Sequence, residues 1–209
     1  AFLFTNAQIS LESSFVGALN SLTPIFTLLI GLYFFQIRPA IKNVLGVIIA
    51  LSGAVLLYFE GFKGMIVINI PVLLVLLATL CYGVSINVIR RYLRRLDSIS
   101  IASISFLFIG PFAGYYIFTT DFLEIAKTED GLISLGYISI LAVFCTSFAV
   151  IIFNKLVKNT SAIFAASVTY LIPIVALFWG ILDDEFITNQ HLVGMLIILS
   201  GVYLVNKRK

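Results

Sequence analysis

Long apolar runs without charged residues constrain this chain more than any other feature. Seven runs of roughly 20 residues lie between charged or turn-rich breaks, and Asp, Glu, Arg and Lys occur only at their ends. A bilayer core about 30 Å thick is crossed by about 20 helical residues. We therefore predict membrane-spanning helices at 13–35, 40–59, 69–89, 98–118, 132–153, 161–181 and 189–206, with residues 1–9 as the end of an eighth.

The composition excludes a soluble or disordered protein. Apolar residues make up 61% of the chain and charged residues 11%, whereas a soluble domain carries about 25% charged residues. Disorder requires low hydrophobicity and high charge. Strands of a membrane barrel would alternate apolar and polar residues, which these runs do not do. The prediction is an all-α, polytopic membrane helix bundle.

The charges in the loops predict how the helices cross the membrane. Basic residues gather at 90–95, 154–160 and 207–209, and acidic residues gather at 119–131 and 182–188. Lys and Arg mark cytoplasmic loops, and these loops agree with strict alternation. We expect a multi-pass protein of the cell (inner or plasma) membrane, surrounded by lipid, with a cytoplasmic C-terminus. The net charge of +3 is modest and gives no sign of a nucleic-acid partner.

The two ends of the chain resemble each other. Residues 15–31 match 164–180 at an offset of 149, and residues 43–57 match 191–205 at an offset of 148. The repeat unit spans five helices, and because five is odd the two copies must lie upside down relative to each other. The loop at 36–42 is basic while its counterpart at 182–188 is acidic, as inversion requires. Inverted repeats recur in secondary transporters.

The stretch from Ser161 to Pro173, with Gly180, Glu185 and Ser200-Gly201 after it, resembles the ninth helix and last hairpin of the EamA group of the drug/metabolite transporter superfamily. Ser21 to Pro24 through Ser52-Gly53 is similar to the matching part of the first EamA repeat. One departure is Gln36, which stands where the second copy has Glu185.

The resemblance implies ten helices in two EamA repeats, with both ends cytoplasmic and a central cavity. Residues 1–61 would be the C-terminal part of the first repeat, and residues 62–209 the complete second repeat. The offset then places the start of the first repeat about 80 residues before Ala1. We expect an N-terminally truncated chain of a protein of about 290 residues, which lacks two helices and most of a third.

Two prolines and two polar helix faces suggest where a solute would bind. Pro24 has no N–H, which frees the carbonyl of Asn20, and Pro173 does the same to Thr169. The predicted helix kinks are Pro24, Pro111 and Pro173, and the predicted substrate-binding residues are Asn20, Thr23, Thr79, Tyr82, Tyr137, Thr169 and Tyr170. The alternatives are packing kinks satisfied by neighbouring hydroxyl groups, and tyrosines of an interfacial belt.

Small residues at helical spacing predict close helix packing. The stripe consists of Gly46, Ala50, Gly53, Gly194 and Gly201. It is expected to pack the span 40–59, the fifth helix of the family's ten, on the span 189–206, the tenth, or to form a homodimer. Cys81 and Cys145 lie within membrane spans and support neither a disulfide nor a metal site. We predict no cofactor and no metal.

The absence of charge from mid-span positions narrows the function. Ionisable residues inside a membrane mark ion and proton pathways, and a carrier of phosphorylated solutes needs Lys or Arg in its cavity. We predict a secondary transporter, not an enzyme, that exports a small neutral or zwitterionic, amino-acid-like metabolite by alternating access. The alternatives are a multidrug efflux protein of the same superfamily and, remotely, a membrane-embedded enzyme with a cluster of His, Cys, Asp or Glu.

Overall fold

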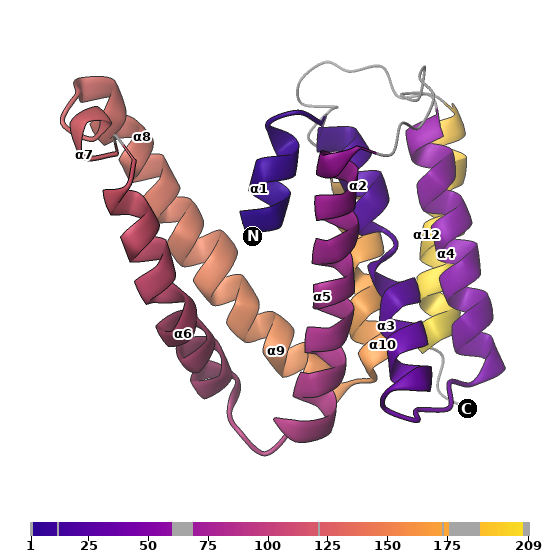
Figure 1. The fold of residues 1–209 in the computed structure, drawn as a ribbon. Helices are drawn as coiled ribbons and strands as arrows, with labels where there is room; N and C mark the ends of the chain where they lie inside the picture. Colours follow the sequence, from indigo (N-terminus) through magenta and orange to yellow (C-terminus); the bar gives the residue numbers. More distant parts are fainter. Residues whose placement is uncertain are drawn as a thin grey trace. The chain divides into compact units, whose positions relative to one another are not determined.

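The computed structural model describes residues 2–11, 13–59, 69–120, 122–172, 174–175 and 189–206. These residues form helices and connecting turns, with no strand among them. The prediction of an all-α protein is therefore confirmed. The helices are α1 (Phe2–Gln8), α2 (Ser13–Asn20), α3 (Thr23–Tyr33), α4 (Ile41–Phe59), α5 (Ile70–Tyr92), α6 (Ser98–Phe118), α7 (Phe122–Ile125), α8 (Glu129–Ile140), η1 (Leu141–Phe148), α9 (Ala149–Asn159), α10 (Ala162–Ser167), η2 (Val168–Tyr170) and α12 (Asn189–Asn206) (Figure 1).

Three described helices are long and apolar enough to cross a membrane: Ile70–Tyr92, Ser98–Phe118 and Glu129–Asn159. Shorter apolar helices occupy Thr23–Tyr33, Ile41–Leu56 and Leu192–Asn206. A polytopic helix bundle with this apolar character suits a bilayer, where every backbone polar group must be satisfied within a helix.

The predicted single span at 13–35 is wrong, because the structure divides it into α2 and α3. Pro24 lies in the first turn of α3, where a missing N–H costs no intrahelical hydrogen bond. The Thr23 hydroxyl donates to the freed Asn20 carbonyl at 2.8 Å. Pro24 thus marks the start of a new helix rather than a kink within one, and a threonine satisfies the carbonyl that we expected a solute to use.

Of the other two prolines predicted to kink a helix, the structure describes one. Pro111 lies inside α6, which remains one helix from Ser98 to Phe118. Pro173 lies outside the described residues. The span predicted at 132–153 is a longer helix, Glu129–Asn159, whose middle winds as a π-helix over Leu141–Phe148.

The chain divides into two compact units, each described separately here. Unit 1 comprises Ala1–Arg91 with Thr160–Lys209, and unit 2 comprises Tyr92–Asn159. These units group helices by packing, whereas the predicted division into residues 1–61 and 62–209 follows the sequence repeat. The repeat division stays a prediction.

Helices α4 and α12 form the most extensive helix contact among the described residues of unit 1, and they lie side by side in Figure 1. A Cβ added to Gly46 would lie 2.7 Å from the Gly201 carbonyl oxygen, and one added to Gly53 would lie 2.8 Å from the Gly194 oxygen. Real Cβ atoms essentially never approach other atoms within 3.0 Å. The two backbones therefore touch directly, as small residues permit in membrane helices.

The small-residue stripe is thus occupied within one chain. Ala50 is fully buried at the same contact, beside Ala54, Tyr170 and Ile198. Packing of the fifth helix on the tenth is what we predicted. We also expected that a homodimer could form through the same stripe. In the structure, helices α4 and α12 of one chain cover it for each other; its residues are Gly46, Ala50, Gly53, Gly194 and Gly201.

The glycine contacts are also reciprocal. Gly46 meets Gly201, and Gly53 meets Gly194. The sequence offset of 148 relates Gly46 to Gly194 and Gly53 to Gly201. Replacing each glycine by its equivalent in the other half therefore converts the Gly46–Gly201 contact into the Gly194–Gly53 contact. Such an exchange is expected of two copies related by a two-fold axis in the membrane plane.

In unit 2, α6 packs against α9 and begins with a charged cap (Figure 1). The Asp97 carboxylate accepts hydrogen bonds from the Ser100 hydroxyl at 2.6 Å and from the Ser100 N–H at 2.9 Å. These bonds favour the ionised form and lower the pKa of Asp97. The Lys158 ammonium donates to the Leu96 carbonyl and ties α9 to the same turn.

Replacing Gly201 with alanine should separate α4 from α12. The new Cβ would lie 2.5 Å from the Ala50 nitrogen, and overpacking of this kind costs about 1–3 kcal/mol of unfolding free energy. Gly114→Ala is the matched control, because a Cβ there meets nothing within 4 Å. Thermal unfolding in detergent measures both variants. Equal melting temperatures for the two variants would contradict the contact.

The cap of α6 should weaken in acid. Because the pKa of Asp97 is lowered in the fold, its contribution is present above the ordinary value of 3.8 and is lost as the pH falls below it. Amide hydrogen exchange at Ser100, corrected for intrinsic rate, should lose protection in that acid range. Asp97→Ser keeps a capping oxygen without a titrating group. A pH dependence that persists in this variant would argue against the cap.

Candidate functional site

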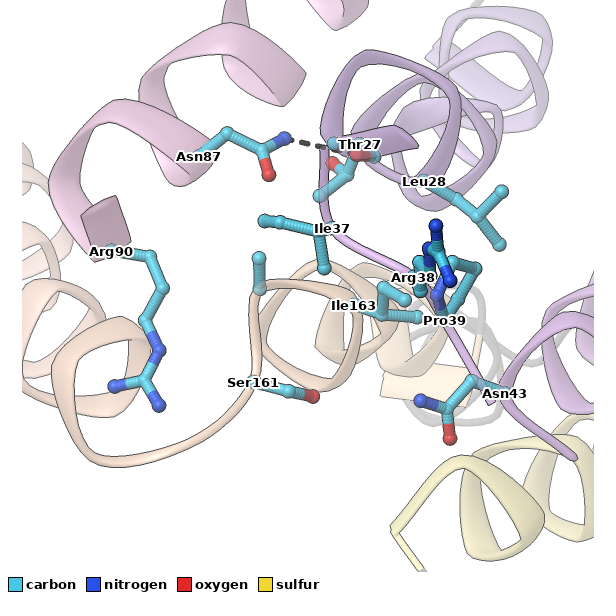
Figure 2. A pocket seen from close by; sticks show the side chains of 12 residues that line it. Thr27, Leu28, Ile37, Arg38, Pro39, Asn43, Asn87, Arg90, Ser161 and Ile163 are labelled. Carbon is cyan, nitrogen blue, oxygen red and sulfur yellow. Dashed lines mark hydrogen bonds between the residues drawn. The ribbon is translucent and has the colours of Figure 1, made fainter. Parts of the chain in front are cut away.

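Unit 1 contains a cavity of about 280 Å³ among α3, the segment that joins α3 to α4, the start of α4, α5 and the start of α10 (Figure 2). It lies at the end of the unit where Arg38 and Arg90 occur. The residues that line it are Thr27, Leu28, Gly31, Ile37, Arg38, Pro39, Asn43, Asn87, Arg90, Ser161, Ala162 and Ile163.

A left-handed turn brings the connecting segment into the cavity wall. Gln36 has a backbone φ of 53°, a value that residues other than glycine seldom adopt. The Ile37 N–H donates to the Gly31 carbonyl at 2.8 Å and closes the turn on the end of α3. As a result Ile37, Arg38 and Pro39 line the cavity instead of continuing along the helix axis.

Asn87 joins α5 to α3 beside the cavity. One turn earlier, a Cβ on Gly83 would lie 3.0 Å from the Thr27 nitrogen, so the two helices touch at that glycine. The Asn87 amide nitrogen donates to the Thr27 carbonyl at 2.9 Å and to the Gly83 carbonyl at 2.8 Å. Figure 2 shows the bond to Thr27 at the cavity wall.

Two amide oxygens at this cavity have no hydrogen-bond partner. They are the Oδ1 atoms of Asn87 and Asn43, and both atoms are buried. Gly31 leaves room for the first, because a Cβ there would lie 3.0 Å from Asn87 Oδ1. A buried acceptor without a donor costs about 1–3 kcal/mol. A ligand with N–H or O–H groups would satisfy these oxygens.

Two arginines also line the cavity, which the sequence did not lead us to expect. Arg38 is exposed and Arg90 is half-buried. Both lie just beyond apolar runs, and a scan along the chain places them in loops. The turn at Gln36 directs Arg38 back over the end of α3. The prediction that mid-span positions hold no Lys or Arg is a separate matter, because both arginines lie beyond the apolar runs.

None of the seven predicted substrate-binding residues lines this cavity. Tyr170 is fully buried against α4 and α12, and its hydroxyl donates to the Val47 carbonyl at 3.3 Å. Thr23 and Thr79 are buried, and each donates to a carbonyl three residues earlier, Thr23 to Asn20 and Thr79 to Leu76, both at 2.8 Å. For these hydroxyl groups the packing alternative describes the observed contacts.

The remaining predicted residues are more accessible but do not form one group. Asn20 and Thr169 are half-buried, and the Thr169 hydroxyl donates to the Ala166 carbonyl at 2.8 Å. Tyr82 is 45% exposed, with its ring centroid 6.0 Å from that of Phe4. Tyr137 belongs to unit 2 and is 71% exposed there. As a solute site, the set stays a prediction.

The described residues contain no group of three or more His, Cys, Asp or Glu that could hold a metal ion. Cys81 and Cys145 are exposed thiols that form no disulfide. Asn87 is the residue that sequence reasoning passed over. The sequence feature that could have identified Asn87 is its polar amide side chain within the apolar span 69–89, one helical turn after Gly83.

Asn87→Leu should destabilise unit 1, because the isosteric side chain loses the hydrogen bond to Thr27 that joins α5 to α3 and a second bond, to Gly83, within α5. We expect a loss of about 1–3 kcal/mol in unfolding free energy. Asn43→Leu is the matched control: it removes an unpartnered buried oxygen and should leave the stability unchanged or higher. Chemical unfolding in detergent compares the two. An Asn87→Leu protein as stable as Asn43→Leu would contradict this role.

Known proteins with similar sequences identify the family of this chain independently of its fold. The model of the EamA-like transporter family matches residues 69–207. An uncharacterized transporter of Archaeoglobus fulgidus is 25% identical over 203 residues, which cover 97% of this chain and 71% of that protein. The uncharacterized transporter YvbV of Bacillus subtilis is 29% identical over 175 residues, which cover 80% of this chain and 54% of that protein.

The fold is also similar to a solved crystal structure. The TM-score is 0.70 at 14% sequence identity, with 98% of this chain and 70% of the other chain covered. Because the family model spans well over half of the residues and the helices are those of a membrane bundle, this chain belongs to the EamA-like transporter family, within the drug/metabolite transporter superfamily.

Proposed function

We propose that this protein is a secondary transporter that moves a small, amino-acid-like metabolite out of the cell by alternating access. The observation that carries the proposal is the reciprocal contact of α4 and α12, in which Gly46 meets Gly201 and Gly53 meets Gly194. A contact that the repeat offset maps onto itself is what two inverted copies of one unit predict. Inverted copies can rock between mirror-related states that open a shared site first to one side and then to the other.

The charges around the cavity favour a zwitterionic solute over a neutral one. Arg38 and Arg90 attract a carboxylate, and the unpartnered oxygens of Asn43 and Asn87 require hydrogen-bond donors. An amino acid carries both kinds of group. Apolar side chains of Leu28, Ile37 and Ile163 occupy the rest of the wall, which suits a solute that is not polar all round.

The export direction follows from the predicted topology. The positive-inside rule assigns the end with Arg38 and Arg90 to the cytoplasm. A solute that binds there enters from inside the cell. The two EamA repeats, residues 1–61 and 62–209, the cytoplasmic C-terminus and the predicted path through Asn20, Thr23, Thr79, Tyr82, Tyr137, Thr169 and Tyr170 belong to the same proposal.

Transport by the full-length protein in proteoliposomes tests this function. A panel of radiolabelled amino acids, measured with and without a pH gradient, should give saturable uptake or counterflow for at least one member. Control liposomes without protein account for leakage. Transport of structurally unrelated cationic drugs in place of amino acids would favour the multidrug efflux alternative. Strong transport of a phosphorylated solute would overturn the proposal.

A further inference from the structure

We propose that the basic end of unit 2 binds an anionic phospholipid, whose phosphate contacts Arg94, Arg95 and Lys155 and whose acyl chain lies along α9. Helix α6 begins and α9 ends at this end of the unit, whereas α7 and the start of α8 lie at the other end (Figure 1). The inference goes beyond the proposed transport function, because it concerns the lipid around the protein and not the solute that the protein moves.

A hydrogen bond between two segments gathers the cations. The Lys158 ammonium donates to the Leu96 carbonyl, in the turn that carries Arg94 and Arg95. Lys155 lies three residues before Lys158 and therefore on the same side of α9. Because α9 is tied to this turn, cations that are far apart in the sequence lie at one end of the unit.

No acidic side chain in the described part of this end neutralises these cations. Arg94, Arg95 and Lys155 are exposed, and none of their side chains forms an ion pair or hydrogen bond with a described residue. Asp97 is the one acidic residue of the turn, and α9 has none. The Asp97 carboxylate already accepts two hydrogen bonds from Ser100. The cations therefore remain available to an anion from outside the protein.

Exposed apolar side chains adjoin the cations on α9. Phe148, Ile152 and Lys155 follow one another at four- and three-residue spacing and so share a face. Phe148 is 60% exposed and Ile152 is 53% exposed. A phospholipid carries its phosphate at the end of hydrocarbon chains, which matches a cation at the end of an apolar stripe. Inorganic phosphate and soluble phosphate esters have no part that would contact this stripe.

The charge of this end and the predicted topology favour an anionic lipid over a zwitterionic one. The positive-inside rule assigns this end to the cytoplasm, where the leaflet carries anionic lipids. Guanidinium groups form paired, charge-assisted hydrogen bonds with phosphate oxygens. Each Lys or Arg near an anionic lipid surface strengthens binding about fivefold. Phosphatidylcholine carries an ammonium group of its own, which the cations of the protein would repel.

Lipid titration of the full-length protein in detergent tests the site. Native mass spectrometry measures the binding of phosphatidylglycerol and of phosphatidylcholine with the same acyl chains. We expect phosphatidylglycerol to bind at least about tenfold more tightly. Glycerol phosphate at the same concentration as the lipid should displace none of it. Equal binding of the two lipids would overturn the proposal. Displacement by glycerol phosphate would also overturn it, because the site would then bind soluble phosphate and not a lipid.

Charge variants locate the binding surface. Arg94→Gln and Lys155→Gln should each weaken phosphatidylglycerol about fivefold and leave phosphatidylcholine unchanged. Lys127→Gln is the matched control, because Lys127 is exposed in the same unit but lies between Glu124 and Glu129 in the sequence, at the other end. It removes the same charge and should bind both lipids as the wild type does. Equal weakening by Lys127→Gln would show an effect of net charge and overturn the site.

Two further outcomes test the parts of the site. If Lys155→Gln binds phosphatidylglycerol as the wild type does while Arg94→Gln does not, a site built from two segments is contradicted. Ile152→Ser should weaken both lipids by the same factor, because it alters the apolar stripe without changing the charge. Normal binding of both lipids by Ile152→Ser would contradict the position of the acyl chain. Thermal unfolding in detergent checks that each variant is folded.

Discussion

The direct backbone contact between α4 and α12 is the interaction on which the rest of unit 1 depends. In a bilayer, lipid tails solvate leucine side chains as well as another helix does, so close packing has to come from shape. Four glycines supply that shape in this chain, two on each helix. The contact then sets where Tyr170 lies, because its ring is buried between these two helices and its hydroxyl reaches the Val47 carbonyl. Tyr170, which the sequence predicted to bind the solute, is part of this packing.

A second glycine contact has a different consequence. Gly83 lets α5 touch α3, and Asn87 then bridges the two helices through its hydrogen bond to the Thr27 carbonyl, while its bond to the Gly83 carbonyl stays within α5. The bridge leaves the amide oxygen buried beside the cavity, without a hydrogen-bond partner. One side chain therefore serves the fold with one end and presents a fixed polar group with the other. Fixed acceptors of this kind bind ligands well, because no side-chain entropy is lost when the ligand arrives.

Much of the fold follows from local features of the sequence. Apolar run lengths predict α4, α5 and α6 within a few residues, and the spacing of Gly46, Gly53, Gly194 and Gly201 predicts the contact of α4 with α12. The break between α2 and α3 was missed because an apolar run shows no gap there. The cavity was missed for a different reason. It depends on the left-handed backbone conformation of Gln36, which a glutamine in the sequence does not predict. Spacing along one helix cannot indicate a cavity whose wall comes from five separate segments.

The reciprocal glycine contact has a consequence for how such a protein diverges after a gene duplication. Two identical copies would have to carry every change on both sides of their symmetry axis, and a ligand site would appear twice. Covalent fusion removes that obligation, so each copy can keep the glycines of the shared contact and change elsewhere. Here the first copy has Gln36, Arg38 and Lys42 where the second has Glu185 and its acidic neighbours. In the predicted repeat arrangement, the contact between α4 and α12 would hold the two copies together, and their sequence differences would make the two ends chemically different.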